Sequence, residues 1–323
     1  MIKKAVILCG GLATRMLPIT KSVSKEMLPI LNKPAIDYCV SDLKANGITD
    51  ILIVLGRNKE SLEEYFDRNV ELEDKLINKD ELTKNSITNM YQGVNLYFIR
   101  QIFAQGTGYA VYKAKNFVNN EPFILMYPDE LMIEQSFTKM LLDEYNKTKK
   151  CIIPIKKISL TESEKYGMLD YQKTNKGIKI NKIVEKPKPE DSPSDVCYTG
   201  GGAFTPDIFD YLEKCKKHNN GEIYLTDAFE GLIQNNNLYG AELKGVRLDV
   251  GTPLGFVKAN VLAGLNDDEI KDELLEFLKT VVGDDSIGKQ TKWCTNSRKC
   301  HCLWQCYICR EMCYWWAHHN LSK

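Results

Sequence analysis

The first thirty residues constrain this chain more than any other stretch. An apolar run of β-forming residues, 5–9, ends at the adjacent glycines Gly10 and Gly11. Glycine has no Cβ, so the backbone can turn sharply here and direct its N–H groups at phosphate oxygens. Two cations, Arg15 and Lys25, follow at short range. This order favours a cradle for a polyphosphate, although an ordinary turn after a strand can contain the same glycine pair.

The loop matches neither of the commonest nucleotide-binding motifs. No Gly-Lys-Ser/Thr follows the glycines, so a Walker A pattern is missing, and the dinucleotide spacing G-x-G-x-x-G is missing as well. If phosphates bind to this loop, they therefore bind in a third way.

Composition limits the classes of protein to consider. With 323 residues, 43% of them hydrophobic, the chain can form one large α/β domain or two small ones. Lys and Arg number 43 and so do Asp and Glu, so no net charge steers the protein toward nucleic acid or an acidic membrane. No stretch approaches the roughly 20 apolar residues of a membrane span, and no secretory signal pattern opens the chain. We expect a cytoplasmic protein without a nucleic-acid partner.

Hydrophobic periodicity predicts alternating strands and helices in the first half. Strands are expected at residues 4–9, 51–55, 96–99 and 123–127, and helices at 34–46, 58–66 and 106–118. Continuous apolar runs are typical of strands buried on both faces of a parallel sheet. The order predicts an α/β fold, with a Rossmann-like, mostly parallel sheet and helices on both faces.

Ligands of such sheets bind beyond the carboxyl ends of the strands. The loops at those ends contain Gly10–Gly11, Gly56–Arg57, Gln101 and Asp129. Asp129 directly follows a buried strand, which suits a metal ligand, although an Asp that starts a turn occupies the same position. Asp249, which follows another short strand, has the same two interpretations.

The second half continues this pattern. Strands are expected at residues 151–155, 178–184 and 246–251, and helices at 205–215, 227–234 and 253–265. An amphipathic helix at 267–281 could pack on the body or on another subunit. We take residues 1–283 as one domain and residues 284–323 as a tail.

A longer pattern surrounds the first loop. Gly-Gly-x-x-Thr-Arg-x-x-Pro at residues 10–18, followed by Lys-Glu-Met-Leu-Pro at 25–29, resembles the signature of the sugar-1-phosphate nucleotidyltransferases. The second motif is similar to that of the bacterial UTP–glucose-1-phosphate uridylyltransferases. The resemblance covers roughly residues 1–282. It implies the nucleotide-diphospho-sugar transferase fold, with a nucleotide half at about 1–130, a sugar-phosphate half with a small sugar-binding subregion at about 131–265, and a C-terminal helix at about 267–281.

The resemblance also implies an activity. Such enzymes transfer a uridylyl group from UTP to glucose 1-phosphate, with Mg²⁺ as cofactor and UDP-glucose and pyrophosphate as products. Two alternatives stay open: a thymidylyltransferase on the same fold, and a non-catalytic regulatory subunit that binds nucleotide sugars. Relatives are commonly dimers or tetramers, which implies a homo-oligomer.

The resemblance assigns roles at the nucleotide. Arg15 and Lys25 match the family's catalytic cations, although most Lys and Arg are simply solvated. Gly10 and Gly11 match the glycines whose backbone approaches the nucleotide.

Further matching positions concern the base and the metal. Gln101 and Gly106 match residues that read the base edge, where an amide offers both a donor and an acceptor. Asp129 and Asp249 match the pair that holds Mg²⁺. Only the fold can bring these two carboxylates together.

Other blocks concern the sugar phosphate. The resemblance implies that Glu185 accepts from sugar hydroxyls, that Lys186 pairs with the phosphate, and that Gly167 and Glu222 border the sugar. Alone, Glu-Lys-Pro at 185–187 is ordinary exposed sequence.

Three departures from the family pattern stand out. Residues 103–109 replace the usual Pro-Leu-Gly-Leu-Gly-His, and Tyr127 replaces a small aliphatic residue. Residues 200–202 are Gly-Gly-Gly where many relatives have Gly-Arg-Tyr, which predicts a more mobile loop.

The tail has a different composition. It contains all four Trp and six of the 11 cysteines, including Cys306-x-x-Cys309. One such pair is weak support for zinc. An extension without a dedicated role, and a contact with a partner or a membrane surface, stay open beside it.

Overall fold

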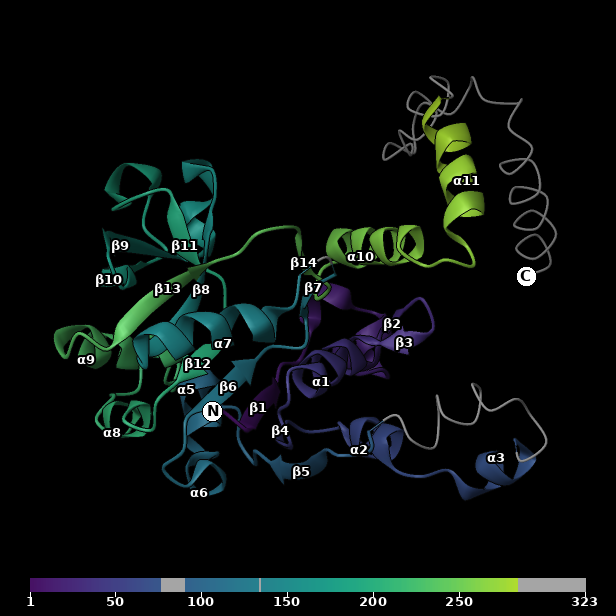
Figure 1. Ribbon diagram of the computed structural model, residues 1–323, viewed down its shortest axis with the longest axis horizontal. Coiled ribbons are helices and arrows are strands. Elements are labelled where there is room, and N and C mark those ends of the chain that lie inside the picture. Colours follow the sequence, from purple (N-terminus) through teal and green to yellow (C-terminus); the bar gives the residue numbers. More distant parts are fainter. Residues whose placement is uncertain (77–90, 134, 284–323) are drawn as a thin grey trace, which may run out of the picture. The chain divides into compact units, whose positions relative to one another are not determined.

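The structure, a computed structural model, describes residues 1–76, 91–133 and 135–283. The chain divides into two units, Met1–Gly264 and Leu265–Lys323, and the first contains the sheet (Figure 1). The Cys- and Trp-rich tail, with its possible zinc site, lies outside the described residues. Our division of the chain into halves, a C-terminal helix and a tail stays a prediction.

Four parallel strands form the part of the sheet that the first half of the sequence predicts. They lie in the order β6 (Phe123–Met126), β1 (Lys4–Cys9), β4 (Asp50–Leu55) and β5 (Asn95–Arg100). Successive side chains of a strand point to opposite faces, so an unbroken apolar run fills both. Ile7 packs in the hydrophobic cluster on one face, and its neighbours Val6 and Leu8 pack in the cluster on the other. The predicted strands are confirmed.

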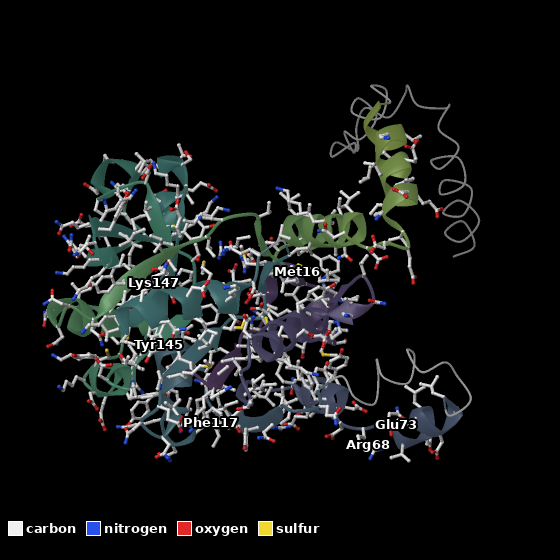
Figure 2. The ribbon with its side chains drawn as sticks, in the orientation of Figure 1. Met16, Arg68, Glu73, Phe117, Tyr145 and Lys147 are labelled. Atoms are coloured by element: carbon white, nitrogen blue, oxygen red, sulfur yellow. The ribbon has the colours of Figure 1, made fainter. Side chains whose placement is uncertain are left out.

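Helices cover both faces of this sheet, as predicted. One hydrophobic cluster includes residues of α1 (Ala35–Ala45), α2 (Glu60–Phe66), α7 (Phe137–Thr148) and α10 (Pro253–Leu265). The other includes residues of α5 (Gly106–Tyr112), α6 (Lys115–Val118), α8 (Ile208–Leu212) and α9 (Phe229–Gln234). The α/β fold is therefore confirmed. In Figure 2, Tyr145 marks the buried side of α7, and Lys147 lies on its exposed side.

Two predicted helices differ in extent. The helix expected at 106–118 is divided into α5 and α6 by a turn at Lys113 and Ala114. The helix expected at 205–215 begins only at Ile208. The Thr205 hydroxyl does not cap it, because that oxygen is engaged by Cys151 Sγ and Asn237 Nδ2, each 3.0 Å away.

Beyond β6 the sheet is mixed. β8 (Cys151–Lys157) and β13 (Leu238–Glu242) are parallel to each other, whereas β9 (Gly167–Thr174), β10 (Gly177–Glu185), β11 (Val196–Tyr198) and β12 (Gly202–Phe204) pair antiparallel. The predicted strands at 151–155 and 178–184 lie within β8 and β10. Strand β13 was not predicted. It contains Gly240, where a Cβ would lie 2.7 Å from Ile155 Cδ1.

The triple glycine before β12 has a steric explanation. Gly200 has a φ of 105°, and a Cβ there would lie 2.7 Å from Cδ2 of Tyr127. A Cβ on Gly201 would lie 2.6 Å from the carbonyl oxygen of Leu125. Close packing against β6 therefore requires these glycines. The expected mobility of the loop stays a prediction.

The remaining elements are short or peripheral. Two small antiparallel sheets pair β7 (Glu130–Met132) with β14 (Arg247–Asp249), and β2 (Pro29–Ile30) with β3 (Lys33–Pro34). Helix α3 (Val70–Lys75) contains Glu73, which pairs with Arg68 just before the helix; both residues are labelled in Figure 2. In the second unit, α11 (Lys271–Gly283) overlaps the amphipathic segment at 267–281 but begins only at Lys271. Among the described residues, no helix has the length and apolar character that crossing a membrane requires.

Candidate functional site

The small β7–β14 sheet brings Asp129 and Asp249 together. Asp129 lies directly before β7, and Asp249 is the last residue of β14, where it pairs with Glu130. The N–H of Val250 donates to the carbonyl oxygen of Asp129 at 2.9 Å. Two carboxylates that are far apart in the sequence therefore lie on adjacent strand ends.

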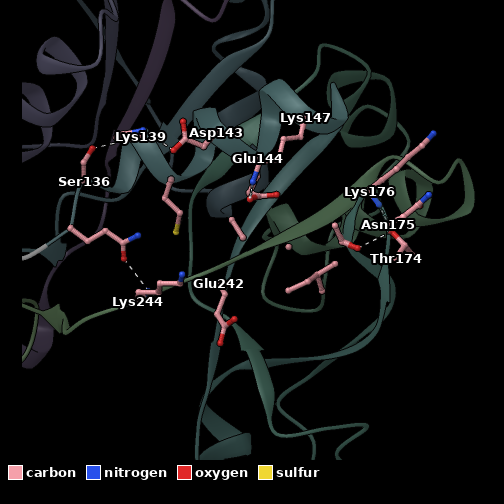
Figure 3. Close-up of a pocket in the computed structure, with 16 residues that line it drawn as sticks. Ser136, Lys139, Asp143, Glu144, Lys147, Thr174, Asn175, Lys176, Glu242 and Lys244 are labelled. Carbon is pink, nitrogen blue, oxygen red and sulfur yellow. Dashed lines mark hydrogen bonds and ion pairs between the residues drawn. The ribbon is translucent and has the colours of Figure 1, made fainter.

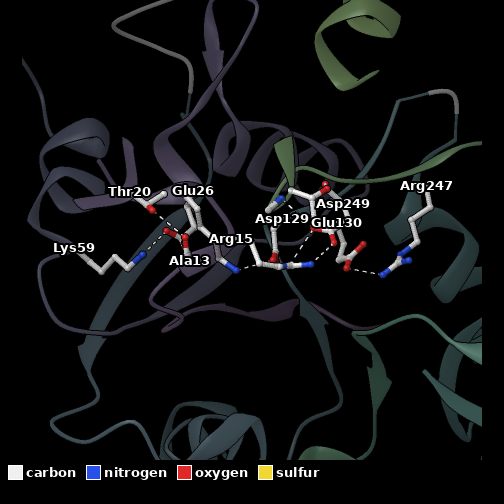
Figure 4. A network of polar contacts seen from close by, with 12 residues as sticks. Ala13, Arg15, Thr20, Glu26, Lys59, Asp129, Glu130, Arg247 and Asp249 are labelled. Atoms are coloured by element: carbon white, nitrogen blue, oxygen red, sulfur yellow. Dashed lines mark hydrogen bonds and ion pairs between the residues drawn. The ribbon is translucent and has the colours of Figure 1, made fainter. Parts of the chain in front are cut away.

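Each of these carboxylates is paired with a predicted catalytic cation. Lys25 Nζ lies 2.6 Å from Asp129 Oδ2, and both side chains are about 15% exposed or less. The Arg15 guanidinium donates to both oxygens of Asp249, at 2.8 and 3.4 Å (Figure 4). Burial lowers the pKa of the Lys25 amine, but Asp129 and the nearby Glu26 and Cys9 together outweigh burial, and the pKa is raised. The four side chains neutralise one another.

The two carboxylates face one small volume. A Cβ on Gly251 would lie 3.0 Å from Asp249 Oδ1, 3.1 Å from Arg15 Nη2 and 3.2 Å from Asp129 Oδ2, so glycine keeps this volume open. Mg²⁺ at nucleotide sites is typically held by one or two carboxylates together with phosphate oxygens. Within the part of the chain that the structure describes, no group of three Asp, Glu, His or Cys forms a complete cage. The donor set fits an ion shared with a phosphate ligand.

A cavity of about 350 Å³ lies beside these charges. Its lining includes many of the predicted site residues: Gly10, Gly11, Lys25, Gln101, Gly106, Asp129 and Glu222. A Cβ on Gly11 would lie 3.6 Å from Lys25 Nζ, so the glycine loop and the buried cation form one wall. The loop therefore combines open backbone with a positive charge, as its sequence predicts.

Gln101 and Gly106 also line this cavity, and a Cβ on Gly10 would lie 3.4 Å from Gln101 Oε1. Gln101 is 6% exposed, and its Nε2 donates to no acceptor among the described residues. Gly106 has a φ of 89°, and a Cβ there would lie 2.3 Å from the carbonyl oxygen of Ile223. The glycine thus lets residues 222–224 lie against the start of α5, which brings Glu222 and Tyr224 to the cavity.

The other residues that we expect at the sugar phosphate lie elsewhere, at the end of the β9–β10 hairpin. Gly167 pairs with Glu185 across the hairpin. Lys186 Nζ lies 3.7 Å from Glu185 Oε1, and both side chains are at least half exposed. None of the three residues lines the cavity beside Asp129.

Two ion pairs in this region were not predicted from the sequence. Glu130 pairs with Arg247 at 2.5 Å, and the fully buried Glu26 pairs with Lys59 at 2.6 Å (Figure 4). Burial raises the pKa of Glu130 to about 8; Arg247 opposes this shift, and Asp129 adds to it. Charged residues are usually exposed, so single positions gave no sign of these pairs. The placement of Arg247 two residues before Asp249, on the same face of a strand, was the available signal.

A larger cavity, of about 670 Å³, lies between α7, the β9–β10 turn and β13 (Figure 3). Four of its charged side chains form two ion pairs: Lys139 pairs with Asp143 at 2.8 Å, and Lys147 with Glu144 at 2.6 Å. It contains none of the predicted site residues. The smaller cavity is therefore the candidate active site.

Known proteins resemble this chain over most of its length. Residues 4–264 match the family model described as nucleotidyl transferase. UTP–glucose-1-phosphate uridylyltransferase 1 of Staphylococcus saprophyticus is 40% identical over 283 residues, which cover 87% of this chain and 99% of that protein. A UDP-glucose pyrophosphorylase structure with UDP-glucose is 35% identical, with a TM-score of 0.74, and covers 83% of this chain and 100% of that chain. A UTP-bound UGPase from Acinetobacter baumannii is 32% identical, with a TM-score of 0.78, and covers 86% and 99%.

Proposed function

The chain belongs to the nucleotidyl transferase family, and we propose that it transfers a uridylyl group from UTP to glucose 1-phosphate. One observation carries this proposal: Asp129 and Asp249, with the cations Lys25 and Arg15, meet beside a cavity walled by a glycine loop. The 40% identity to a uridylyltransferase, over nearly its whole length, supports UTP and glucose 1-phosphate as the substrates.

The proposed reaction is a displacement at phosphorus. An oxygen of the sugar phosphate attacks the α-phosphorus of UTP, the bond from that phosphorus to the bridging β-phosphate oxygen breaks, and pyrophosphate leaves. The attacking group is already an anion, so the protein's main tasks are to align the reactants and to neutralise their charge. Lys25 supplies a mostly buried charge beside Gly11, and Arg15 supplies a planar set of donors on the more open side.

Asp129 and Asp249 are the residues that would hold Mg²⁺. When bound, this ion supplies further neutralisation of the phosphate charge. Because Lys25 and Arg15 already pair with the same carboxylates, we infer that both cations turn from the carboxylates to the phosphates as the substrates bind. The protein thereby keeps its buried charges paired both before and after binding.

We assign the base to Gln101 and Gly106. The unpartnered Nε2 of Gln101 supports this assignment, because a pyrimidine carbonyl can accept its hydrogen bond. We assign the sugar phosphate to Glu222, at the cavity, and to the hairpin residues Gly167, Glu185 and Lys186. A metal-binding carboxylate pair is not needed by a non-catalytic sensor, which argues against that alternative.

Assembly and location complete the proposal. We expect a homo-oligomer, a dimer or a tetramer, with α11 as a candidate contact between subunits. We expect the enzyme to act in the cytoplasm, because UTP and glucose 1-phosphate are metabolites of that compartment.

Pyrophosphate release tests the reaction and the base together. Purified protein is supplied with glucose 1-phosphate and Mg²⁺, and UTP, dTTP, CTP, ATP and GTP are compared with and without a chelator. We expect release with UTP that the chelator stops. A preference for dTTP would favour the thymidylyltransferase, and no release by folded protein with any nucleotide would favour the sensor.

Single substitutions test the metal assignment. We expect Asp129→Asn and Asp249→Asn each to reduce turnover by roughly 10²-fold or more, because each removes a charge where phosphates react. Asp143→Asn is the matched control, since Asp143 pairs with Lys139 on the exposed face of α7. Full activity of both site variants would show that the metal assignment is wrong.

A further inference from the structure

We propose that Arg247 is a positioning residue that holds the metal-binding carboxylates and the sugar-phosphate residues in one arrangement. The proposal rests on the proposed function and adds a residue to it. Arg247 lies in β14, two residues before Asp249, and its side chain is 14% exposed.

One guanidinium contacts three separate segments of the chain. Nη2 of Arg247 lies 2.5 Å from Glu130 Oε1 and donates to the carbonyl oxygen of Thr199 at 3.0 Å. Its central carbon lies 5.8 Å from the centre of the Tyr166 ring. Figure 4 shows Arg247 reaching Glu130 beside Asp129 and Asp249. The contacts join β7, the turn before β12 and the residue before β9.

Two of the residues that Arg247 contacts are neighbours of those that we assign to the metal and to the sugar phosphate. Glu130 directly follows Asp129 and pairs with Asp249 across the β7–β14 sheet. Tyr166 directly precedes Gly167, and its carbonyl oxygen accepts from the N–H of Lys186 at 3.0 Å. Since Lys186 and Gly167 do not line the cavity, Arg247 provides a direct side-chain connection between the two groups of residues.

The chemistry of the pair favours positioning over stabilisation. Removing a carboxylate and a guanidinium from water costs free energy, and a buried ion pair often gives no net stabilisation. In this pair, Arg247 Nε and Glu130 Oε2 are buried without a hydrogen-bond partner among the described residues. Burying such atoms costs free energy that no hydrogen bond offsets. A planar, rigid guanidinium is nevertheless well suited to contact a carboxylate, a carbonyl and an aromatic ring at once.

Kinetics with each substrate varied separately test the proposal. We expect Arg247→Lys and Arg247→Gln to lower kcat by about 10- to 100-fold and to raise KM for glucose 1-phosphate, because a small misplacement of reacting groups is costly. KM for UTP should change by less than about twofold, since the contacts to Gly11 and Gln101 are untouched. Arg68→Gln is the control, because it breaks an Arg–Glu ion pair with α3 in which the Arg68 side chain is 74% exposed and which includes none of the assigned site residues.

A binding measurement provides a second result that does not depend on turnover. Without metal, we expect Arg247→Gln to bind UDP-glucose at least about fivefold more weakly than the unmodified protein, and UTP equally well. Glu130→Gln keeps the shape of its side chain and removes the charge, so it should show the same selectivity if Arg247→Gln fails to fold.

The possible results separate the proposal from its premise. Unchanged kinetics, or equal losses for both substrates, would overturn the positioning role. A loss that merely follows a fall in thermal stability would do the same. Failure of the unmodified protein and of Arg68→Gln to release pyrophosphate would instead contradict the proposed function. In that case, a selective loss of UDP-glucose binding would still support the connection made by Arg247.

Discussion

The two ends of the candidate site are built differently. At the nucleotide end, Lys25 and Asp129 form a mostly buried ion pair against the parallel strand β1 and its glycine loop. At the sugar-phosphate end, Glu185 and Lys186 lie 3.7 Å apart at the end of an antiparallel hairpin, with at least half of each side chain exposed. The proposed nucleotide end is thus held by a mostly buried ion pair in the absence of a ligand, whereas we propose that the sugar-phosphate end is completed by the ligand and positioned by Arg247.

Metal removal should have the largest effect on activity and the smallest effect on stability. We expect a chelator to abolish uridylyl transfer while the melting temperature stays unchanged, because Lys25 and Arg15 already pair with the two carboxylates. Activity assays and thermal unfolding of the same sample measure both effects. A large fall in the melting temperature would mean that the ion also maintains the fold.

Lys25→Met should damage the preorganised end next most strongly. The change leaves Asp129 without its 2.6 Å partner, so we expect a loss of turnover on the order of 10²- to 10³-fold and a loss of about 1–3 kcal/mol in the free energy of unfolding. Steady-state kinetics and urea unfolding measure the two. Lys139→Met, which breaks an exposed pair on α7, is the control and should leave both almost unchanged.

Gly106→Ala should disturb the same end through the backbone. The new Cβ would lie 2.3 Å from the carbonyl oxygen of Ile223, so residues 222–224 must move and the free energy of unfolding should fall by about 1–3 kcal/mol. Gly93→Ala is a matched control, since Gly93 has a φ of 86° and open space around it. Urea unfolding should show the larger loss for Gly106→Ala, and KM for glucose 1-phosphate should rise only in that variant. Equal losses would mean that backbone strain alone decides the effect.

Lys186→Gln should have the smallest effect. The Lys186 side chain is 60% exposed, so we expect the free energy of unfolding to change by less than about 0.5 kcal/mol. KM for glucose 1-phosphate should rise about tenfold, which corresponds to the loss of one charged contact. Lys165→Gln, which lies in another exposed ion pair, should change neither quantity. If Lys186→Gln destabilised the protein markedly, the comparison between the two ends would be wrong.

The sequence predicts the parallel strands well because their signal is local. Each of the four parallel strands β1, β4, β5 and β6 contains a continuous apolar run between polar turns, so its type and approximate limits can be predicted without knowledge of its neighbours. The glycine loop and the position of Asp129 after a strand follow in the same way.

Other features depend on contacts between distant segments. The meeting of Asp129 and Asp249 requires the pairing of β7 with β14, two strands too short to be recognised alone, and it was expected only from the resemblance to the family. Strand β13 contains Gly240, which suits that position only because Ile155 packs against it. Glu26 follows Lys25 directly, and two adjacent charged residues give no sign that one of them is buried. Its ion pair with Lys59 explains the burial.

The close packing of Gly201 and Gly202 restricts how this enzyme can be recombined with its relatives. A Gly-Arg-Tyr loop grafted at residues 200–202 would place a Cβ at position 201 that lies 2.6 Å from the carbonyl oxygen of Leu125, and one at position 202 that lies 2.5 Å from the carbonyl oxygen of Ile152. A side chain at position 200 would meet the Tyr127 ring in the same way. Chimeras should therefore exchange the end of β6 and the glycine turn as one unit, because the turn packs closely against Leu125 and Tyr127.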